Sequence, residues 1–237
     1  MTAISASRSR SLFVMLVLHP GRTVSQARLA EAMWDTNPPA SFAANLRTYA
    51  HRLRRELGEL GAALHARNGG YLLDAALYEC DHTYFHELAK RGRQSLVSRD
   101  AAGAIANLAA AIGLWRGSHA AEGVARNGPL DVLLAALEEE RLRATEDLAE
   151  ALIQVGEARA ALVSLYPLLA AAPLRSRAWQ LRMEAHRRLG ELGAVSECYH
   201  QMTEVFYREI DVGPDPELTV LYNAIIRGDD RVGIGCT

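Results

Sequence analysis

Residues 46–57 read LRTYAHRLRREL, and the spacing of their apolar side chains decides the fold of the N-terminal part of the chain. At about 100° per residue these positions share one arc of an α-helix, which predicts a core-facing stripe. The stripe consists of Phe42, Leu46, Tyr49, Ala50, Leu53 and Leu57. The opposite side carries Thr48, His51, Arg52 and Arg55, with Arg47 and Arg54 on one flank. The arginines therefore form an outward ridge about as wide as a helix.

Two shorter helices are predicted before this stretch and a β-hairpin after it. Residues 11–19 form an apolar helix, and Ser25 is the candidate N-cap of a second helix that stops at residues 35–39. The short apolar runs 63–66 and 71–73 flank a glycine pair, which is typical of a hairpin. Three helices and a hairpin predict a winged helix-turn-helix, whose third helix enters the DNA major groove while the wing touches the backbone.

Positive charge is concentrated in this module. Residues 1–71 hold nine arginines and four acidic residues, a net charge of +5, whereas residues 72–237 hold 17 basic and 24 acidic residues, a net charge of −7. Such asymmetry favours a nucleic-acid-binding module joined to a second part. Arginine contacts guanine in the major groove and clamps phosphates, and we expect phosphate contacts at Arg55 and at Arg67 in the wing tip. The alternative is a solvated basic face.

Length and composition indicate an ordinary globular protein. With 237 residues, 49% of them hydrophobic and 23% charged, the chain is long enough for one large domain or two small ones. Cys80, Cys198 and Cys236 lie far apart without metal-ligand spacing, which favours reduced thiols in the cytosol. Residues 12–18 (LFVMLVL) are too short to span a bilayer, and a secretory signal is the lesser alternative to a buried helix.

From Asp81 onward the sequence is rich in alanine and leucine and predicts a second, all-helical part. Helices are expected at about residues 81–96, 98–115, 130–154, 157–171, 174–190, 192–209 and 215–227. Gly156-Glu157 recurs 34 residues later as Gly190-Glu191, which is the period of the tetratricopeptide repeat. Residues 99–105 look like an earlier copy, displaced by an insertion around residues 116–130. Such helix pairs stack to bury a shared core and usually bind proteins, including other copies of themselves.

The sequence holds no pattern that points to catalysis. His82 and His86 have the i, i+4 spacing of metal ligands on a helix, but no HExxH motif surrounds them, and an ordinary helix start is the simpler interpretation. No glycine-rich phosphate loop and no GxSxG motif is present. We therefore expect no enzyme activity, no cofactor and no metal.

Motifs in both halves resemble those of the Streptomyces antibiotic regulatory protein (SARP) family, over about residues 11–230. In the N-terminal half, which is similar to the OmpR-type winged helix, they are residues 19–25 (HPGRTVS), 29–34, 38–41 (PPAS), 46–57 and 69–71 (GGY). In the C-terminal half, which is similar to the bacterial transcriptional activation domain, they are residues 114–117 (LWRG), 173–175 (PLR) and 210–218 (IDVGPDPEL). The expected fold is mainly α, with a winged helix at 1–75 and tetratricopeptide-like repeats at 78–230.

The resemblance implies an activator of secondary-metabolite (antibiotic) gene clusters. Such a protein binds direct repeats in double-stranded promoter DNA, as a homodimer, and recruits RNA polymerase; no membrane partner is implied. Carried over by position, the residues that face bases or phosphates are Arg47, Thr48, His51, Arg52 and Arg54, and Arg67 and Tyr71 belong to the wing. The loop that meets the polymerase begins Asp35-Thr36-Asn37-Pro38 and ends at Pro39.

In one respect the sequence departs from the family. The family's winged helix usually begins with a small antiparallel β-sheet, whereas only residues 1–10, mostly Ser, Ala and Arg, precede the first helix here. Either the start codon is misassigned or the sheet is missing. A missing sheet would uncover part of the first helix. The absence of the sheet also favours the alternative function, a helical-repeat interaction module whose truncated N-terminal domain no longer binds DNA by itself.

Overall fold

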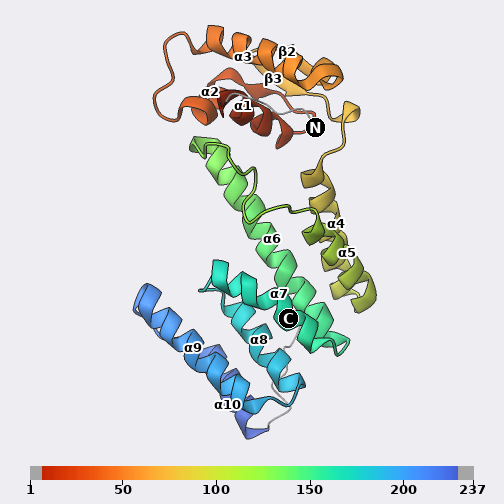
Figure 1. The fold of residues 1–237 in the computed structure, drawn as a ribbon, viewed down its shortest axis with the longest axis vertical. Coiled ribbons are helices and arrows are strands. Elements are labelled where there is room, and N and C mark those ends of the chain that lie inside the picture. Colours follow the sequence, from red (N-terminus) through yellow and green to blue (C-terminus); the bar gives the residue numbers. More distant parts are fainter. Residues whose placement is uncertain (1–6, 229–237) are drawn as a thin grey trace. The chain divides into compact units, whose positions relative to one another are not determined.

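The computed structural model describes residues 7–228, and these form two compact units built mainly from helices (Figure 1). The first unit comprises the described residues up to His86 together with Leu114–Glu140. The second comprises Glu87–Gly113 together with the described residues from Arg141 onward. The predicted fold class, a winged helix followed by an α-helical part, is confirmed. The sequence placed the boundary between the two parts at residues 75–78. The first unit continues past this boundary to His86 and also includes Leu114–Glu140.

Three helices form the body of the winged helix: α1 (Ser7–Val17), α2 (Gln26–Trp34) and α3 (Phe42–Leu57). Ser25 caps α2 as predicted, since its hydroxyl accepts a hydrogen bond from the backbone N–H of Arg28. Asp35, the C-cap residue that follows α2, has a positive φ of 59°. α1 begins four residues earlier than predicted, because the small side chains of Ser9 and Ser11 are buried as part of its inner face.

A three-stranded antiparallel sheet of order β1-β3-β2 completes the winged helix. β2 (Leu64–Arg67) and β3 (Gly70–Leu73) form the predicted hairpin, in which Arg67 is paired with Gly70. The short strand β1 (Val24–Ser25) was not predicted from the sequence, and it pairs Val24 with Tyr71. The turn η1 (Gly58–Ala63) connects α3 to β2.

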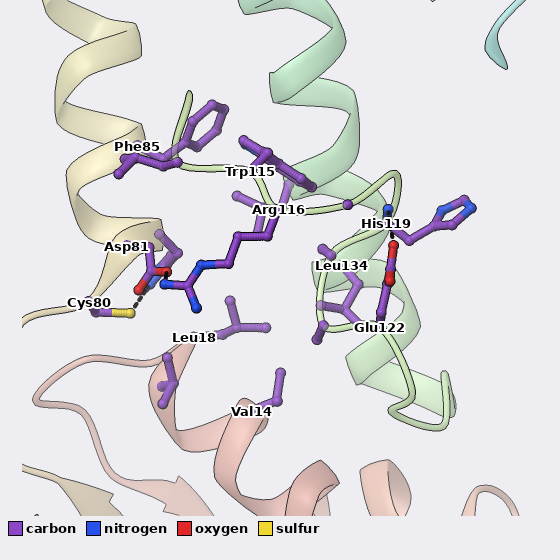
Figure 2. A pocket seen from close by; sticks show the side chains of 17 residues that line it. Val14, Leu18, Cys80, Asp81, Phe85, Trp115, Arg116, His119, Glu122 and Leu134 are labelled. Atoms are coloured by element: carbon purple, nitrogen blue, oxygen red, sulfur yellow. Dashed lines mark hydrogen bonds and ion pairs between the residues drawn. The ribbon is translucent and has the colours of Figure 1, made fainter. Parts of the chain in front are cut away.

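The core of the first unit reaches beyond the winged helix. Leu130 and Leu134, on the N-terminal half of α6 (Gly128–Gln154), are 0% and 1% exposed and belong to the same apolar cluster as the buried face of α1. Figure 2 shows Leu134 facing Val14 and Leu18 of the α1 segment. Burial of such side chains stabilises a fold by roughly 1.5–3 kcal/mol each. A segment of the C-terminal sequence module thus supplies cover for α1.

A cavity of about 430 Å³ lies inside the first unit beside α1 (Figure 2). Its walls come from the end of α1, the start of α4 (Asp81–Val97), the loop at residues 114–122 and α6. Glu138 on α6 holds this loop, because its carboxylate accepts hydrogen bonds from the backbone N–H of Ala120 at 2.9 Å and from Arg126 at 2.8 Å.

The helices predicted after Asp81 are all present. Besides α4 and α6 they are α5 (Ala101–Gly113), α7 (Ala158–Ala171), α8 (Ser176–Arg188), α9 (Leu192–Ile210) and α10 (Pro216–Arg227). In the second unit, residues of α6 to α10 share one apolar core that includes Leu165, Trp179, Met183 and Phe206. This arrangement is a stack of helix pairs.

The predicted repeat is visible in the way the helices end. Gly156 and Gly190 have φ values of +87° and +73°, at the ends of α6 and α8. The residues that follow them, Glu157 and Glu191, each donate a backbone hydrogen bond to the carbonyl five residues earlier. Arg99 takes the same left-handed conformation after α4, with a φ of 61°. The three copies therefore share one way of ending a helix, which glycine satisfies most easily.

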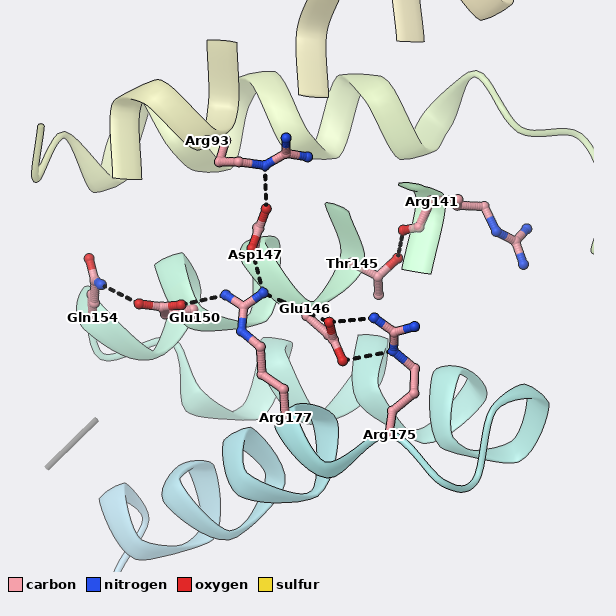
Figure 3. Close-up of polar contacts among 9 residues, drawn as sticks. All are labelled: Arg93, Arg141, Thr145, Glu146, Asp147, Glu150, Gln154, Arg175 and Arg177. Atoms are coloured by element: carbon pink, nitrogen blue, oxygen red, sulfur yellow. Dashed lines mark hydrogen bonds and ion pairs between the residues drawn. The ribbon is translucent and has the colours of Figure 1, made fainter. Parts of the chain in front are cut away.

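Ion pairs join α6 to the start of α8 in the second unit (Figure 3). Glu146, with a side chain only 2% exposed, accepts two hydrogen bonds of 2.8 Å from Arg175. Arg177 binds two further carboxylates of α6 at 2.7 Å each, those of Asp147 and Glu150. A buried, bidentate pair of this kind fixes the geometry between the elements that carry its two ends.

Three further observations concern the described residues as a set. No helix among them is long and apolar enough to cross a membrane. Within residues 7–228 no group of three or more His, Cys, Asp or Glu side chains is arranged to hold a metal ion, and His86 pairs with Glu140 at 2.6 Å. Cys80 and Cys198 are free thiols, and Cys236 lies outside the described part of the chain.

Candidate nucleic-acid interface

The buried face of α3 fixes the direction of its basic face. Leu46, Ala50 and Leu53 are 0% exposed, and Tyr49 makes an edge contact with Trp34 of α2, with the ring centroids 6.0 Å apart. These contacts leave the opposite side of the helix in solvent. The predicted site residues exposed there are Arg47, Thr48, His51, Arg52 and Arg55. The outward ridge deduced from periodicity is therefore present on the molecule.

Two members of this ridge already have partners on their own helix. Arg52 forms an ion pair with Glu56 through its Nε, at 3.0 Å, and the arginine side chain remains 48% exposed. The hydroxyl of Thr48 donates to the carbonyl of Ala44 at 3.2 Å. Glu56 thus places a negative charge next to the ridge and neutralises part of it. The sequence interval of four residues was a visible signal for this pair.

Arg54 lies differently from the other arginines. It is only partly exposed, and its Nε–H donates a hydrogen bond to the carbonyl of Leu64 at 2.9 Å. Leu64 is the first residue of β2, so this contact joins α3 to the wing. We assign Arg54 a positioning role for the wing, which periodicity alone does not reveal.

Backbone contacts hold the wing close to the start of α2. Gly69 has a φ of +74°, and its carbonyl accepts a hydrogen bond of 2.9 Å from the backbone N–H of Gln26. Gly70 lies so close to the carbonyl oxygen of Val24 that a Cβ atom at this position would overlap that oxygen. Arg67 is exposed at the end of β2, where the expected phosphate contact requires it.

Tyr71 belongs to the wing, as expected, but its side chain lies in the core. It is 4% exposed, and burial raises the pKa of its phenol, while the charges of Arg54 and Arg47 act in the opposite direction. In this position the ring supports the hairpin from beneath, whereas a direct contact with DNA needs an exposed side chain. We therefore treat Tyr71 as a support of the wing.

The loop between α2 and α3 is open to solvent. All four residues expected to meet the polymerase are exposed: Asp35, Thr36, Asn37 and Pro38. The left-handed conformation of Asp35 turns the chain sharply out of α2, and its backbone N–H bonds to the carbonyl of Glu31 at 2.8 Å. The loop therefore has a fixed origin and an accessible surface.

An exposed basic helix, a wing attached to it and a domain of stacked helix pairs define a winged-helix transcriptional regulator. Residues 80–226 match the family model described as bacterial transcriptional activator domain. Residues 4–73 match the model described as transcriptional regulatory protein, C terminal. Both models cover the parts of the chain in which the structure places the helix pairs and the winged helix.

Similar proteins agree with these matches. Regulatory protein AfsR of Streptomyces griseus is 33% identical over 226 residues, which are 95% of this chain and 23% of AfsR. Regulatory protein DnrI of Streptomyces peucetius is 31% identical over 236 residues, which are 96% of this chain and 86% of DnrI. The structure of Mycobacterium tuberculosis EmbR in complex with a low-affinity phosphopeptide has a TM-score of 0.84 at 25% identity, covering 94% of this chain and 60% of that one. The chain belongs to the SARP family of transcriptional regulators.

Proposed function

We propose that this protein is a sequence-specific DNA-binding activator. α3 reads a half-site in the major groove of double-stranded DNA through the exposed ridge, with Arg47, His51 and Arg52 nearest the bases. Arg55 on α3 and Arg67 in the wing bind phosphates. Arg54 and Tyr71 act on DNA indirectly, because they hold the wing in place.

The observation that carries this proposal is the attachment of the wing to the basic helix. The hydrogen bond from Arg54 to Leu64 and the bond from Gln26 to Gly69 tie both ends of the hairpin to helices of the winged helix. A recognition helix and a wing that are held together can contact base edges and the neighbouring backbone at once. A basic face that served only for solubility would need no such attachment.

The wider role follows from the family. We infer that the exposed loop Asp35–Pro38 contacts RNA polymerase and that the helix pairs align two copies of the protein on direct repeats. The regulated genes are those of a secondary-metabolite cluster, and the protein works in the cytoplasm on the nucleoid. The relatives AfsR and DnrI, both named regulatory proteins of Streptomyces, support the regulatory part of this assignment.

Hydroxyl-radical footprinting of promoter fragments from the protein's own gene neighbourhood tests the proposal. We expect protection of two short tandem segments in the same orientation, one for each copy. The Arg47→Ala variant should lose this protection, whereas Arg159→Ala, at an exposed arginine of α7, should keep it. Uniform weak protection of all fragments by the unaltered protein would contradict sequence-specific binding.

A further inference from the structure

The cavity beside α1 is lined mainly by apolar and aromatic side chains. Val14 and Leu18 of the α1 segment form one side, and Leu134 of α6 lies opposite them (Figure 2). Phe85 and Trp115 meet edge to face, with ring centroids 5.6 Å apart at an angle of 82°, and both line the cavity. The volume of about 430 Å³ falls in the range of roughly 300–1,000 Å³ that is usual for small-molecule sites.

The charged side chains that line this cavity already have partners. At its mouth the carboxylate of Asp81 and the guanidinium of Arg116 form an ion pair of 3.2 Å, so their charges offset each other. The carboxylate of Glu122 accepts hydrogen bonds of 3.1 and 3.4 Å from two backbone N–H groups of the 114–122 loop. Deeper in the wall, the Cys80 sulfur lies 3.2 Å from Nδ1 of His82. Burial raises the pKa of the Cys80 thiol and lowers the pKa of the His82 imidazole, and both groups are therefore neutral near pH 7.

A neutral thiol and a neutral imidazole can still form hydrogen bonds. If the thiol donates to Nδ1, the other ring nitrogen of His82 carries a proton and can donate to an acceptor. The cavity thus combines an apolar, partly aromatic body with a neutral hydrogen-bonding pair, which is the usual pattern of a small-molecule site. A charged ligand would have to leave water and compete with these existing contacts for a counter-charge.

We propose that this cavity is a binding site for an uncharged, mainly aromatic small molecule that bears one hydrogen-bonding group, received by the Cys80–His82 pair between Trp115, Phe85 and the end of α1. The site lies apart from the basic face of α3, and its existence does not depend on DNA binding. Its α1 wall nevertheless belongs to the same core as α3, so an occupied cavity would stabilise the winged helix.

Two matched fluorescent probes test the proposal on the full chain. N-phenyl-1-naphthylamine is an uncharged amine that joins a phenyl ring to a naphthalene ring. 8-Anilinonaphthalene-1-sulfonate has the same framework and adds a negatively charged sulfonate group. We expect saturable binding of the uncharged probe and weaker binding of the sulfonate. Energy transfer from tryptophan to the bound probe should fall strongly in Trp115→Phe, because this variant keeps an aromatic wall and removes the nearest donor.

Filling the cavity provides the decisive comparison. Val14→Trp places a large ring in the cavity, and we expect it to weaken binding of the directly excited uncharged probe by about tenfold or more, a change of about 1.4 kcal/mol. Val163→Trp adds the same ring at a position that is 74% exposed on α7, and it should leave binding unchanged. Leu137→Trp, which fills the cavity from α6, replaces Val14→Trp if the latter does not melt cooperatively.

Three results would overturn the assignment. The first would be that the uncharged probe fails to saturate. The second would be that a folded cavity-filling variant binds this probe as well as the unaltered protein does. The third would be that the sulfonate binds more tightly than the amine. The first two results remove the site, and the third removes its preference for an uncharged ligand.

Discussion

Arg54 on α3 donates a hydrogen bond from Nε to the carbonyl oxygen of Leu64, the first residue of β2, at 2.9 Å. This single contact explains why one arginine of the basic helix is turned away from the exposed ridge. It adds a polar contact to the apolar core that α3 already shares with the hairpin, which includes Leu53, Leu64 and Tyr71. The charge on the donor strengthens the bond relative to one between neutral groups.

Arg54→Ala should therefore lower the free energy of unfolding by about 1–2 kcal/mol, since a partly buried hydrogen bond from a charged group is lost. Urea denaturation monitored by circular dichroism measures this change. Arg55→Ala, at an exposed neighbour on the same helix, is the matched control and should alter stability by less than about 0.5 kcal/mol. Equal stability of the two variants would show that Arg54 does not hold the wing.

The ion pair between Arg52 and Glu56 leads to a prediction of gain instead of loss: breaking it should strengthen DNA binding. Glu56→Gln removes the negative charge that lies 3.0 Å from the arginine, and it should increase affinity for DNA a few-fold at low salt because the ridge becomes more positive. Fluorescence anisotropy with a promoter fragment measures the gain. Glu87→Gln, an exposed carboxylate on α4, should produce no gain. A loss of affinity in Glu56→Gln would mean that the pair positions Arg52 for binding.

Two ion pairs of the second unit differ in burial, and we expect them to differ in their contribution to the free energy of unfolding. Glu146→Ala leaves the guanidinium of Arg175 without its bidentate partner in a mostly buried place, and we expect a loss of about 3 kcal/mol in the free energy of unfolding. Glu150→Ala removes a contact to Arg177, whose side chain is 41% exposed, and should cost about 1 kcal/mol or less. Thermal and urea denaturation of the full chain distinguish the two. Similar losses in both variants would contradict this ranking.

Glu184 gives the second unit a defined response to acid. Burial alone would raise the pKa of this carboxyl, but hydrogen bonds and charges of Arg187 and Arg188 outweigh it and hold the pKa below the ordinary value of 4.5. A depressed folded-state pKa stabilises the fold fully above the unfolded value, and this contribution is lost as pH falls below 4.5 toward the folded-state value. Glu184→Gln should therefore be less stable than the unaltered chain at pH 7, and the difference in urea midpoint should shrink on acidification. A difference that stays constant with pH would contradict this account.

Much of the architecture follows from local pattern. The helices after Asp81 were predicted because alanine-rich amphipathic segments end at clear glycine, proline or aspartate signals. The repeat was predicted because Gly156-Glu157 recurs 34 residues later as Gly190-Glu191, and the structure gives both glycines the same left-handed helix end. The basic face of α3 was predicted because helical periodicity determines direction once the apolar residues are known.

The remaining features depend on contacts between distant residues. The hydrogen bond from Arg54 to Leu64 needs the exact path of η1, which has no periodic signal. β1 has two residues, too few to show alternation, and it exists because Val24 meets Tyr71. The Tyr71 side chain, in the same pair, is buried. Leu130 was expected in a separate repeat domain, and only the folded chain places it in the core of the first unit.

The central claim is that the basic helix and the wing bind DNA together. The most direct test is a fluorescence-anisotropy titration of the full chain with a promoter fragment over a range of salt concentrations, for the unaltered protein, Arg55→Ala, Arg67→Ala and the control Arg159→Ala. We predict that each of the first two variants binds more weakly and loses about one unit of the slope of log affinity against log salt concentration, while the control loses neither. Unchanged affinity and slope in both Arg55→Ala and Arg67→Ala would contradict the proposed interface.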